Sequence, residues 1–368
     1  MRVGFDAKRL FFNDTGLGVY SRLLVRQLAT KYPSHQYILF SANAQKSAYY
    51  RHFSDLDIVG NSLPVYRSWR MSSDIHRTNC DVFHGLSHEL PLGLKKTRVK
   101  SIVTIHDLIF EHYPDLYPFI DRTIYRWKWK HSCHFADIVI AVSEQTKRDL
   151  IELYRIDETR IRVIPPMFSD QFDRAVSVSD KIKASQEHNL PEEFFLFVGS
   201  ITRRKNLIII IEAMSKLQAG ERLPLLVIGS HGDDYKNVLS QISKYGLRDW
   251  VHFLSAIENE QLHIFYKLAR ALIYPSLFEG FGIPIVESLR CGTPVITSSI
   301  SSMPEAAGPG ALYIDPNDSD ALAQHMLAIR QHSTYEVLST AGQKHVEQFS
   351  PDNVGKQVLD LYQELLSR

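Results

Sequence analysis

Two glutamates, Glu279 and Glu287, stand eight positions apart around a glycine-containing stretch with the sequence EGFGIPIVE. Carboxylates accept paired hydrogen bonds from vicinal hydroxyls, which are the groups that sugars and riboses offer. Gly280 and Gly282 let a backbone approach a ligand closely, and Pro284 suits the first turn of a helix. The pattern predicts a loop and a helix N-terminus that bind an anion such as a pyrophosphate between two hydroxyl-binding carboxylates.

Each glutamate taken alone has a simpler explanation. Glu279 would suit a solvated loop, and Glu287 would merely complement the dipole of the helix that follows. We favour the binding site because both glutamates, both glycines and the proline occur together at this spacing.

Basic residues follow an earlier apolar run that ends at Gly199, namely Arg203, Arg204 and Lys205. Cations behind a strand fit a diphosphate that leaves with added negative charge, because they stabilise that charge as it develops. The alternative is a solvated basic turn.

Histidines follow two apolar runs of the first half. His106, with Asp107 after it, ends residues 102–106, and ligand sites of α/β proteins lie at such strand ends, although a lone histidine there is more often structural. His84 and His88 flank the end of a shorter run. A metal site made by these two residues and Glu89 is disfavoured, because their spacing matches no zinc pattern.

A third candidate is the loop that contains Gly16 and Gly18, which follows the first apolar run and precedes an amphipathic stretch. A glycine loop at a helix N-terminus suits a phosphate. The dinucleotide fingerprint GxGxxG is absent, and a purely structural turn is the alternative.

The elements that must position these residues alternate between short apolar runs and helical stretches, which predicts parallel α/β sheets. The chain has 368 residues, 44% of them hydrophobic and 23% charged, which is enough for two domains with separate cores. Twelve strands are expected, at 3–7, 37–41, 82–84, 102–106, 138–142, 162–165, 194–199, 224–229, 251–254, 271–275, 294–297 and 312–314.

Domain boundaries are expected near the proline pair at 165–166, which is followed by the mostly polar residues 169–185. We therefore expect a first domain at 1–167, a second at 168–352, and a terminal helix at 353–368. Apolar residues recur at helical spacing in that last segment.

Charge and cysteine content exclude several classes of protein. The formal net charge of +1 gives no global attraction to nucleic acid, and the three cysteines show neither zinc-site nor disulfide spacing. The chain begins without the pattern of a signal peptide and has no apolar run long enough to span a membrane. These features favour a cytoplasmic protein.

Residues 122–131 mix cations with Tyr125, Trp127 and Trp129. These residues spread around a helix, so part of them must be buried, and a core helix with a charged flank is the simpler interpretation. The alternative is peripheral contact with the inner face of the plasma membrane, where a lipid-linked acceptor and anionic headgroups would be met.

The stretch FEGFGIPIVESLRCGTPVI closely resembles glycosyltransferase family 4, whose members are retaining nucleotide-sugar glycosyltransferases of the GT-B fold. The resemblance implies two Rossmann-like α/β domains that face each other across a cleft, with the terminal helix packed on the first domain. It also implies that Glu279 contacts the transferred sugar and that Glu287 holds the ribose. The backbone of the intervening loop would bind the diphosphate, through Gly280, Phe281, Gly282 and Ile283.

Further motifs carry the same resemblance, including MRVGFDAKRL, HGLSHELP, HDLIFEHYP and VGSITRRKNL. It implies that His106 contacts the transferred sugar near its reacting end and that Lys205 matches the family's lysine. Ser200 stands where the family usually has an arginine, and Arg204 is expected to supply that charge. The loop with Gly16 and Gly18 would lie over the diphosphate, and the acceptor side would be lined by His84, His88 and Asp107.

The resemblance therefore implies transfer of a sugar to a hydroxyl, with mannose from GDP-mannose as the expected donor, in bacterial surface-polysaccharide synthesis such as that of O-antigen. The acceptor would be a glycan or a lipid-linked glycan, and no metal or other cofactor is expected to be required. A UDP-sugar donor and a non-catalytic nucleotide-sugar-binding scaffold are the alternatives. Neither the oligomeric state nor the linkage follows from the sequence.

Overall fold

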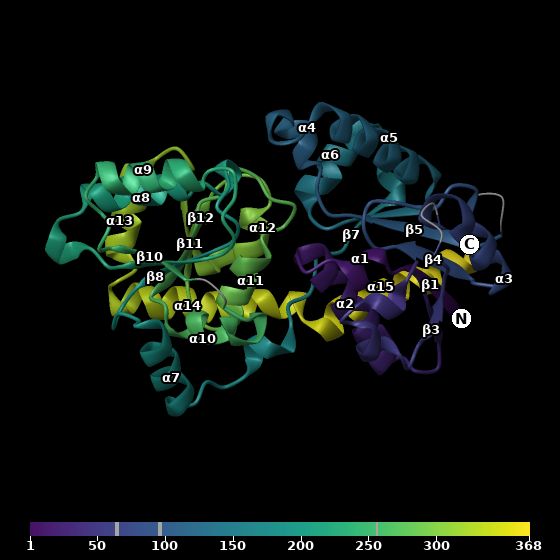
Figure 1. Cartoon of the computed structure of the whole chain (residues 1–368), viewed down its shortest axis with the longest axis horizontal. Helices are drawn as coiled ribbons and strands as arrows, with labels where there is room; N and C mark the ends of the chain where they lie inside the picture. The colour runs from purple at the N-terminus through teal and green to yellow at the C-terminus, as the bar shows by residue number, and fades with distance from the viewer. Residues whose placement is uncertain (63–65, 95–97, 255–256) are drawn as a thin grey trace. The chain divides into compact units, whose positions relative to one another are not determined.

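The computed structural model describes residues 1–62, 66–94, 98–254 and 257–368 (Figure 1). The chain divides into two compact units. Unit 1 comprises residues 1–167 together with 349–368, and unit 2 comprises residues 168–348. Each unit is a parallel sheet covered by helices, so the predicted class of two α/β domains is confirmed.

The sheet of unit 1 has seven strands in the order β3-β2-β1-β4-β5-β6-β7. Their bounds are β1 (Arg2–Asp6), β2 (Gln36–Phe40), β3 (Asp57–Val59), β4 (Val82–Gly85), β5 (Lys100–Ile105), β6 (Ile138–Ala141) and β7 (Ile161–Val163). Strand β3 was not expected, because its three partly exposed residues form no apolar run. The order in which successive strands are added reverses between the parallel strands β1 and β4. Loops after two such neighbouring strands run to opposite sides of the sheet, and ligands of α/β proteins bind between them at the carboxyl ends.

Helices cover both faces of this sheet. One face packs against α1 (Lys8–Phe12), α2 (Gly16–Lys31) and α15 (Pro351–Ser367) through Val3 and Phe5. The other packs against α4 (Ile109–His112), α5 (Phe119–Phe135) and α6 (Glu144–Tyr154) through Val103 and Ile105, and α3 (Met71–Arg77) covers its edge. Successive strand residues point to opposite faces, which explains the two sets of core residues.

The C-terminal helix α15 lies beside α2 in unit 1 (Figure 1). It begins with Pro351 after Ser350, whose hydroxyl accepts from the N–H of Asn353. Its apolar residues at helical spacing are buried in the core of unit 1, namely Val354, Val358, Leu361 and Leu365. Among the described residues of both units, no helix combines the length and the apolar character that crossing a bilayer requires.

The sheet of unit 2 has six strands in the order β10-β9-β8-β11-β12-β13. Their bounds are β8 (Phe195–Val198), β9 (Leu225–Ile228), β10 (Val251–Leu254), β11 (Ala271–Tyr274), β12 (Val295–Ser298) and β13 (Ala311–Ile314). All six were expected from their apolar runs. Strand order reverses between β8 and β11, so the loops after these two strands border a crevice at the carboxyl edge.

The helices of unit 2 form two layers on either side of the sheet (Figure 1). One layer contains α8 (Leu207–Lys216), α9 (Tyr235–Lys244) and α13 (Ser319–Ala328). The other contains α10 (Leu262–Leu268), α11 (Ile283–Arg290), α12 (Met303–Ala307) and α14 (His332–Val346). Helix α11 carries the glycine stretch at its N-terminus, so the fold places this stretch at the carboxyl edge of β11.

The polar segment 169–185 is not simply a connection. It contains the short helical turn η7 (Asp170–Asp173) and most of α7 (Val178–His188). Helix α7 starts at a capping box, in which Ser177 accepts from the N–H of Asp180 and Asp180 accepts from the N–H of Ser177. This local signal specifies a helix despite the polar composition.

Candidate active site

The loops that follow β8 and β11 are joined directly in unit 2. The N–H of Leu277 donates to the carbonyl of Arg204 at 2.8 Å. Asn206, in the left-handed conformation with φ 58°, donates from its side chain to the carbonyls of Pro275 and Pro316. These bonds bring the basic loop and the glycine stretch together at the point where strand order reverses.

Glu279 is the centre of this cluster. Its Oε1 atom lies 2.5 Å from Nη1 of Arg204 and 2.7 Å from Nζ of Lys205. The hydroxyl of Tyr274, at the end of β11, donates to the same oxygen at 3.1 Å. Glu279 is only 8% exposed, so the ion pairs are largely shielded from solvent. The structure thus brings together three residues predicted from separate motifs, and adds a tyrosine.

The charge state of Glu279 follows from its neighbours. Burial by itself would raise the pKa of this carboxyl, but the cations of Lys205 and Arg204 outweigh burial and lower the pKa to about 2. Glu279 is therefore a carboxylate at neutral pH. With two cations around one anion, the cluster carries a net positive charge, which suits a diphosphate.

The glycine stretch has a conformation that exposes its backbone donors. Gly282 has φ of 110°, and a Cβ there would lie 3.1 Å from the side chain of Ile285. Ser302 donates to the carbonyls of Glu279 and Phe281 at 2.9 and 3.0 Å. Within the described ranges, the N–H groups of Gly280, Gly282 and Ile283 donate to no other residue. They lie at the N-terminus of α11, where the helix dipole favours an anion.

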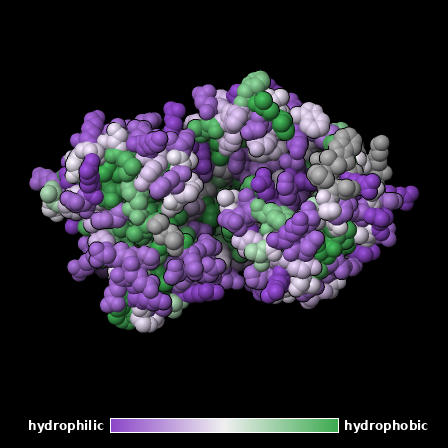
Figure 2. All heavy atoms as spheres, in the orientation of Figure 1, coloured by the Kyte–Doolittle hydropathy of each residue, from purple (hydrophilic) through white to green (hydrophobic). Residues whose placement is uncertain are grey.

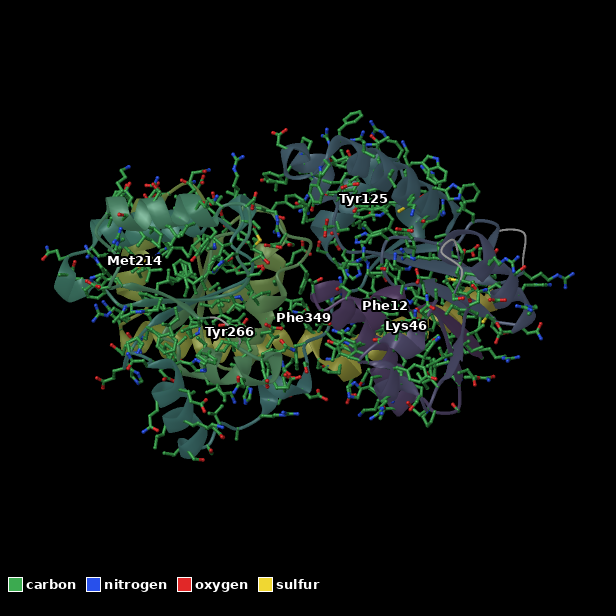
Figure 3. The ribbon with its side chains drawn as sticks, in the orientation of Figure 1. Phe12, Lys46, Tyr125, Met214, Tyr266 and Phe349 are labelled. Carbon is green, nitrogen blue, oxygen red and sulfur yellow. The ribbon has the colours of Figure 1, made fainter. Side chains whose placement is uncertain are left out.

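Glu287 lies in the second turn of α11 and faces Tyr266 of α10. The Tyr266 hydroxyl, in the side chain labelled in Figure 3, donates to Oε2 of Glu287 at 2.9 Å. Burial raises the pKa of Glu287 to about 7, although the hydrogen bond from Tyr266 opposes the rise. The two glutamates therefore differ sharply in charge behaviour, which their common spacing motif does not reveal.

Ser200 does not take part in the Glu279 cluster. It is exposed, and its hydroxyl accepts from the hydroxyl of Ser230 at 2.9 Å. The stem of Lys205 passes over Gly199, where a Cβ would lie 3.4 Å from Cε of the lysine. Arg204, by contrast, reaches both Glu279 and the carbonyl of Phe278.

His106 lies at the end of β5 in unit 1. Its Nε2 atom is 2.9 Å from the carbonyl of Leu86, and the ring of Tyr20 packs edge-on at 4.6 Å between centroids. Burial lowers the pKa of His106 to about 4, so the ring is neutral near pH 7. Because a carbonyl only accepts, Nε2 carries the proton and Nδ1 keeps a lone pair that can accept from a hydroxyl.

His84 has a structural position, which corrects its expected place on the acceptor side. The side chain is fully buried, with Nδ1 2.7 Å from the hydroxyl of Tyr362 in α15 and Nε2 2.7 Å from the hydroxyl of Thr104. Burial lowers the pKa of His84 to about 3. Both ring nitrogens are used inside the core, so this histidine joins the last helix to the sheet.

His88 and Asp107 lie at the carboxyl edge of the same sheet. The buried ring of His88 stacks on Trp129 at 3.8 Å and lies 5.2 Å from the ring of His106. Asp107 accepts from the N–H of Ile109 at 3.1 Å, at the start of α4. His88 and His106 are therefore neighbours, whereas the carboxylate of Asp107 supports a helix start.

An ion-pair chain that the sequence did not suggest crosses the point where strand order reverses in unit 1. Arg67 pairs with Asp6 at 2.6 Å and with Glu89 at 3.1 Å, and Glu89 pairs with Lys128 at 3.3 Å. Asp6 ends β1, so these ion pairs lie at the carboxyl edge of the first sheet. Sequence spacing could not relate Arg67 to Asp6, because 61 positions separate them.

Gly16 and Gly18 lie in the first turn of α2 and not in a loop before it. A Cβ on Gly18 would lie 1.7 Å from the carbonyl oxygen of Asn13, so this glycine is required by close packing. The side chain of Asn13 accepts from the N–H of Gly18 at 2.9 Å, which satisfies one donor of the helix N-terminus. Gly16 is exposed, with open space around it.

In the described parts of the chain, no three histidine, cysteine, aspartate or glutamate side chains are grouped as a possible metal site.

Comparison with known proteins bears on both units. Residues 15–185 match the family model Glycosyltransferase Family 4, and residues 178–345 match the model Glycosyl transferases group 1. O-antigen chain mannosyltransferase B of Escherichia coli is 28% identical over 389 residues, covering 99% of this chain and 100% of that protein. O-antigen chain mannosyltransferase RfbU of Salmonella typhimurium is 31% identical over 244 residues, covering 66% of this chain and 63% of that protein.

A solved structure agrees with this assignment at the level of fold. HepE of Anabaena, in complex with UDP and glucose, aligns with a TM-score of 0.76 at 18% identity, covering 99% of this chain and 100% of that chain. The protein is therefore an enzyme of the glycosyltransferase class with the GT-B fold. The family 4 match lies in the first part of the chain, and the group 1 match follows it.

Proposed function

We propose that this enzyme transfers mannose from GDP-mannose, with retention of anomeric configuration, to a hydroxyl of a glycan or lipid-linked glycan in bacterial surface-polysaccharide synthesis. The Glu279 cluster at the carboxyl edge of unit 2 is the observation that carries the catalytic part. The choice of mannose is supported by the full-length similarity to an O-antigen chain mannosyltransferase.

In this proposal unit 2 binds the donor. The N–H groups of Gly280, Gly282 and Ile283 receive the diphosphate, and the cations of Arg204 and Lys205 stabilise its charge as the glycosidic bond breaks. Glu279 accepts hydrogen bonds from mannose hydroxyls through Oε2, because Arg204, Lys205 and Tyr274 contact its other oxygen, Oε1. Glu287 accepts the ribose hydroxyls.

Retention follows from the chemistry proposed for the leaving group. No side chain of the cluster is placed as a nucleophile, since Glu279 is held by two cations and Tyr274. The departing diphosphate oxygen would instead take the proton of the acceptor hydroxyl, on the same face of the sugar. Arg204 and Lys205 favour this route by stabilising the negative charge on that phosphate. The transfer would then need no metal ion or other cofactor.

Unit 1 supplies the acceptor side in this proposal. Neutral His106 has the Nδ1 lone pair available to a sugar hydroxyl, and the carboxylate of Glu89, which pairs with Arg67, is a second candidate acceptor of hydrogen bonds. Binding of a phosphate by Gly16 at the exposed start of α2 is a further part of the proposal, as the family resemblance implies.

A uridine nucleotide sugar is the alternative donor. HepE, whose solved structure contains UDP and glucose, shares the fold over nearly the whole chain. The features of unit 2 described above contact phosphates and hydroxyls, which GDP and UDP sugars have in common. The nucleobase must therefore be identified by experiment.

The experiment is a thermal-stability screen of the purified protein with GDP, GDP-mannose, UDP and UDP-glucose. A ligand that binds only the native state raises the melting temperature by mass action. Stabilisation by GDP and GDP-mannose alone supports the proposal. Stabilisation by UDP and UDP-glucose alone would mean that the donor is a UDP sugar. If no nucleotide stabilises the protein, both the transferase and the nucleotide-sugar-binding scaffold are rejected.

The outer face of α5 supports a further part of the proposal, namely contact with a membrane surface. Ile120 and Trp127 are 69% and 58% exposed, and Phe119 before them is 74% exposed. Figure 2 shows hydrophobic side chains on the surface over the first turns of α5. Lys130 is exposed beside this face, whereas Lys128 pairs with Glu89. The apolar side chains would enter the interface and Lys130 would meet anionic headgroups.

A further inference from the structure

Each of the two glutamates accepts a hydrogen bond from the hydroxyl of a buried tyrosine. Tyr274 donates to Glu279 at 3.1 Å, and Tyr266 donates to Glu287 at 2.9 Å. The two tyrosines are 1% and 0% exposed. Neither lies in the EGFGIPIVE stretch, since one ends β11 and the other is in α10. Each carboxylate therefore has its own phenolic donor from another element.

Tyr274 links the cation and the carboxylate of the cluster. Its hydroxyl accepts from the ammonium of Lys205 and donates to Oε1 of Glu279. The same ammonium lies 4.4 Å from the centroid of the Tyr274 ring. The backbone carbonyl of Tyr274 accepts from the hydroxyl of Thr297 at 2.7 Å, which fixes the strand end. The phenol thus holds Lys205 and one oxygen of Glu279 in a defined arrangement.

Tyr266 is fixed in the same way on the helix side. Its backbone carbonyl accepts from the buried hydroxyl of Thr293 at 2.6 Å, and its ring packs edge-on against Phe172 at 5.9 Å. Its hydroxyl donates to Oε2 of Glu287, so a ribose hydroxyl would bond to the other oxygen, Oε1. A single donor on one carboxylate oxygen orients the whole planar group.

The geometry points to Tyr274 and Tyr266 as positioning residues, one for each glutamate, which act separately on the transferred sugar and on the nucleotide. Tyr274 holds Glu279 so that its second oxygen receives sugar hydroxyls. Tyr266 holds Glu287 so that its second oxygen receives the ribose. This inference rests on the proposed function, because it assigns the sugar to Glu279 and the ribose to Glu287.

Three single-hydroxyl deletions test the inference. The variants are Tyr274→Phe, Tyr266→Phe and, as a matched control, Tyr313→Phe, whose hydroxyl donates to the carbonyl of Gly308 in the same unit. Affinities for the nucleoside diphosphate that stabilises the wild type, and for its nucleotide sugar, are measured by calorimetry, together with kcat and KM for transfer. Melting temperatures confirm that each variant folds.

Tyr274→Phe should lower kcat about tenfold or more, because Glu279 loses the donor that orients it toward the sugar. The affinity for the free nucleoside diphosphate should stay within about twofold, because Lys205 loses its hydrogen bond to the phenol but keeps its ion pair with Glu279. Tyr266→Phe should lower the affinity for the free nucleoside diphosphate about tenfold and change kcat little. Tyr266→Phe should also move the pH dependence of nucleotide binding upward, because the opposing hydrogen bond to Glu287 is gone. The control should match the wild type.

Equal losses in both tyrosine variants, with no split between nucleotide and sugar, would reduce the tyrosines to structural residues and overturn the inference. The same conclusion follows if both variants behave like Tyr313→Phe. A wild-type protein that binds no nucleotide would instead refute the proposed function, so the two failures are distinguishable.

Discussion

Oε1 of Glu279 and the hydroxyl of Tyr274 lie 3.1 Å apart at the end of β11, and Lys205 contacts both groups. A carboxylate, a phenol and an ammonium thus form one hydrogen-bonded cluster. Arg204 adds a second cation at 2.5 Å from Glu279. This arrangement joins the motif EGFGIPIVE and the basic loop 76 positions before it in a single charged site.

Acid sensitivity should depend on Glu279. The pKa of this carboxyl falls from 4.5 to about 2 on folding, so its ionised form stabilises the native state above pH 4.5, and the stabilisation is lost as the pH falls toward 2. The shift corresponds to about 3 kcal/mol. Glu279→Gln should lower the free energy of unfolding at pH 7 and flatten its acid dependence, as measured by urea denaturation. An unchanged acid limb would contradict the ion-pair arrangement.

The contribution of Glu287 to stability should have the opposite pH dependence. Its pKa rises from 4.5 to about 7 on folding, so the native state loses stability as the pH rises from 4.5 to 7. Ribose hydroxyls need the carboxylate as an acceptor, so nucleotide affinity should increase between pH 6 and pH 8. Glu287→Gln should remove this pH dependence. Calorimetry of GDP or UDP binding across that range measures the effect, and a pH-independent wild type would contradict it.

Arg204 should provide the charge that the family usually places at position 200. Arg204→Ala should weaken donor binding about tenfold to a hundredfold, since a charge-assisted hydrogen bond is lost. Arg203→Ala, an exposed cation of the same loop, is the matched control and should change little. Adding Ser200→Arg to Arg204→Ala should recover part of the affinity, because position 200 is exposed and tolerates a long side chain. Failure of the added arginine to restore any binding would mean that the two positions are not interchangeable.

His84 and Tyr362 should matter for stability alone. Tyr362→Phe leaves Nδ1 of a buried histidine without its 2.7 Å partner, which should cost about 1–3 kcal/mol of unfolding free energy. Thermal denaturation measures this cost, and nucleotide affinity serves as the internal control. Loss of nucleotide affinity without loss of stability would show that His84 acts in ligand binding and not in stability.

The outer face of α5 should bind anionic vesicles. Ile120→Ser combined with Trp127→Ser should reduce sedimentation with phosphatidylglycerol vesicles severalfold, because both side chains are exposed and apolar. Val337→Ser, at a residue 68% exposed in unit 2, is the control for loss of a surface hydrophobic group. Lys128 is unsuitable for this test because it pairs with Glu89. Equal sedimentation of both variants and the wild type would contradict the proposed contact between α5 and a membrane surface.

The sequence predicted the fold well because parallel strands buried on both faces are continuous apolar runs. Strand β3, with only three partly exposed residues, lacked that signal. His84 was misplaced for a related reason: its side chain points to the face of the sheet covered by α15, and the register of a strand end was not evident from one histidine.

The candidate site was predictable only where its residues share a local motif. Glu279, Glu287, Arg204 and Lys205 stand in two such motifs, and the fold brings three of them into contact. Tyr274 and Tyr266 could not be found in this way. A tyrosine in an apolar strand or helix looks like a core residue until the partner of its hydroxyl is known.

Retaining mannosyl transfer is tested most directly by NMR analysis of the product made by the purified enzyme. GDP-mannose carries an α-linked mannose, and the acceptor would be a mannose-terminated oligosaccharide. We expect a new α-mannosidic linkage together with stoichiometric GDP, and almost no product with Glu279→Gln. A β-linked product, or transfer from a UDP sugar and not from GDP-mannose, would contradict it.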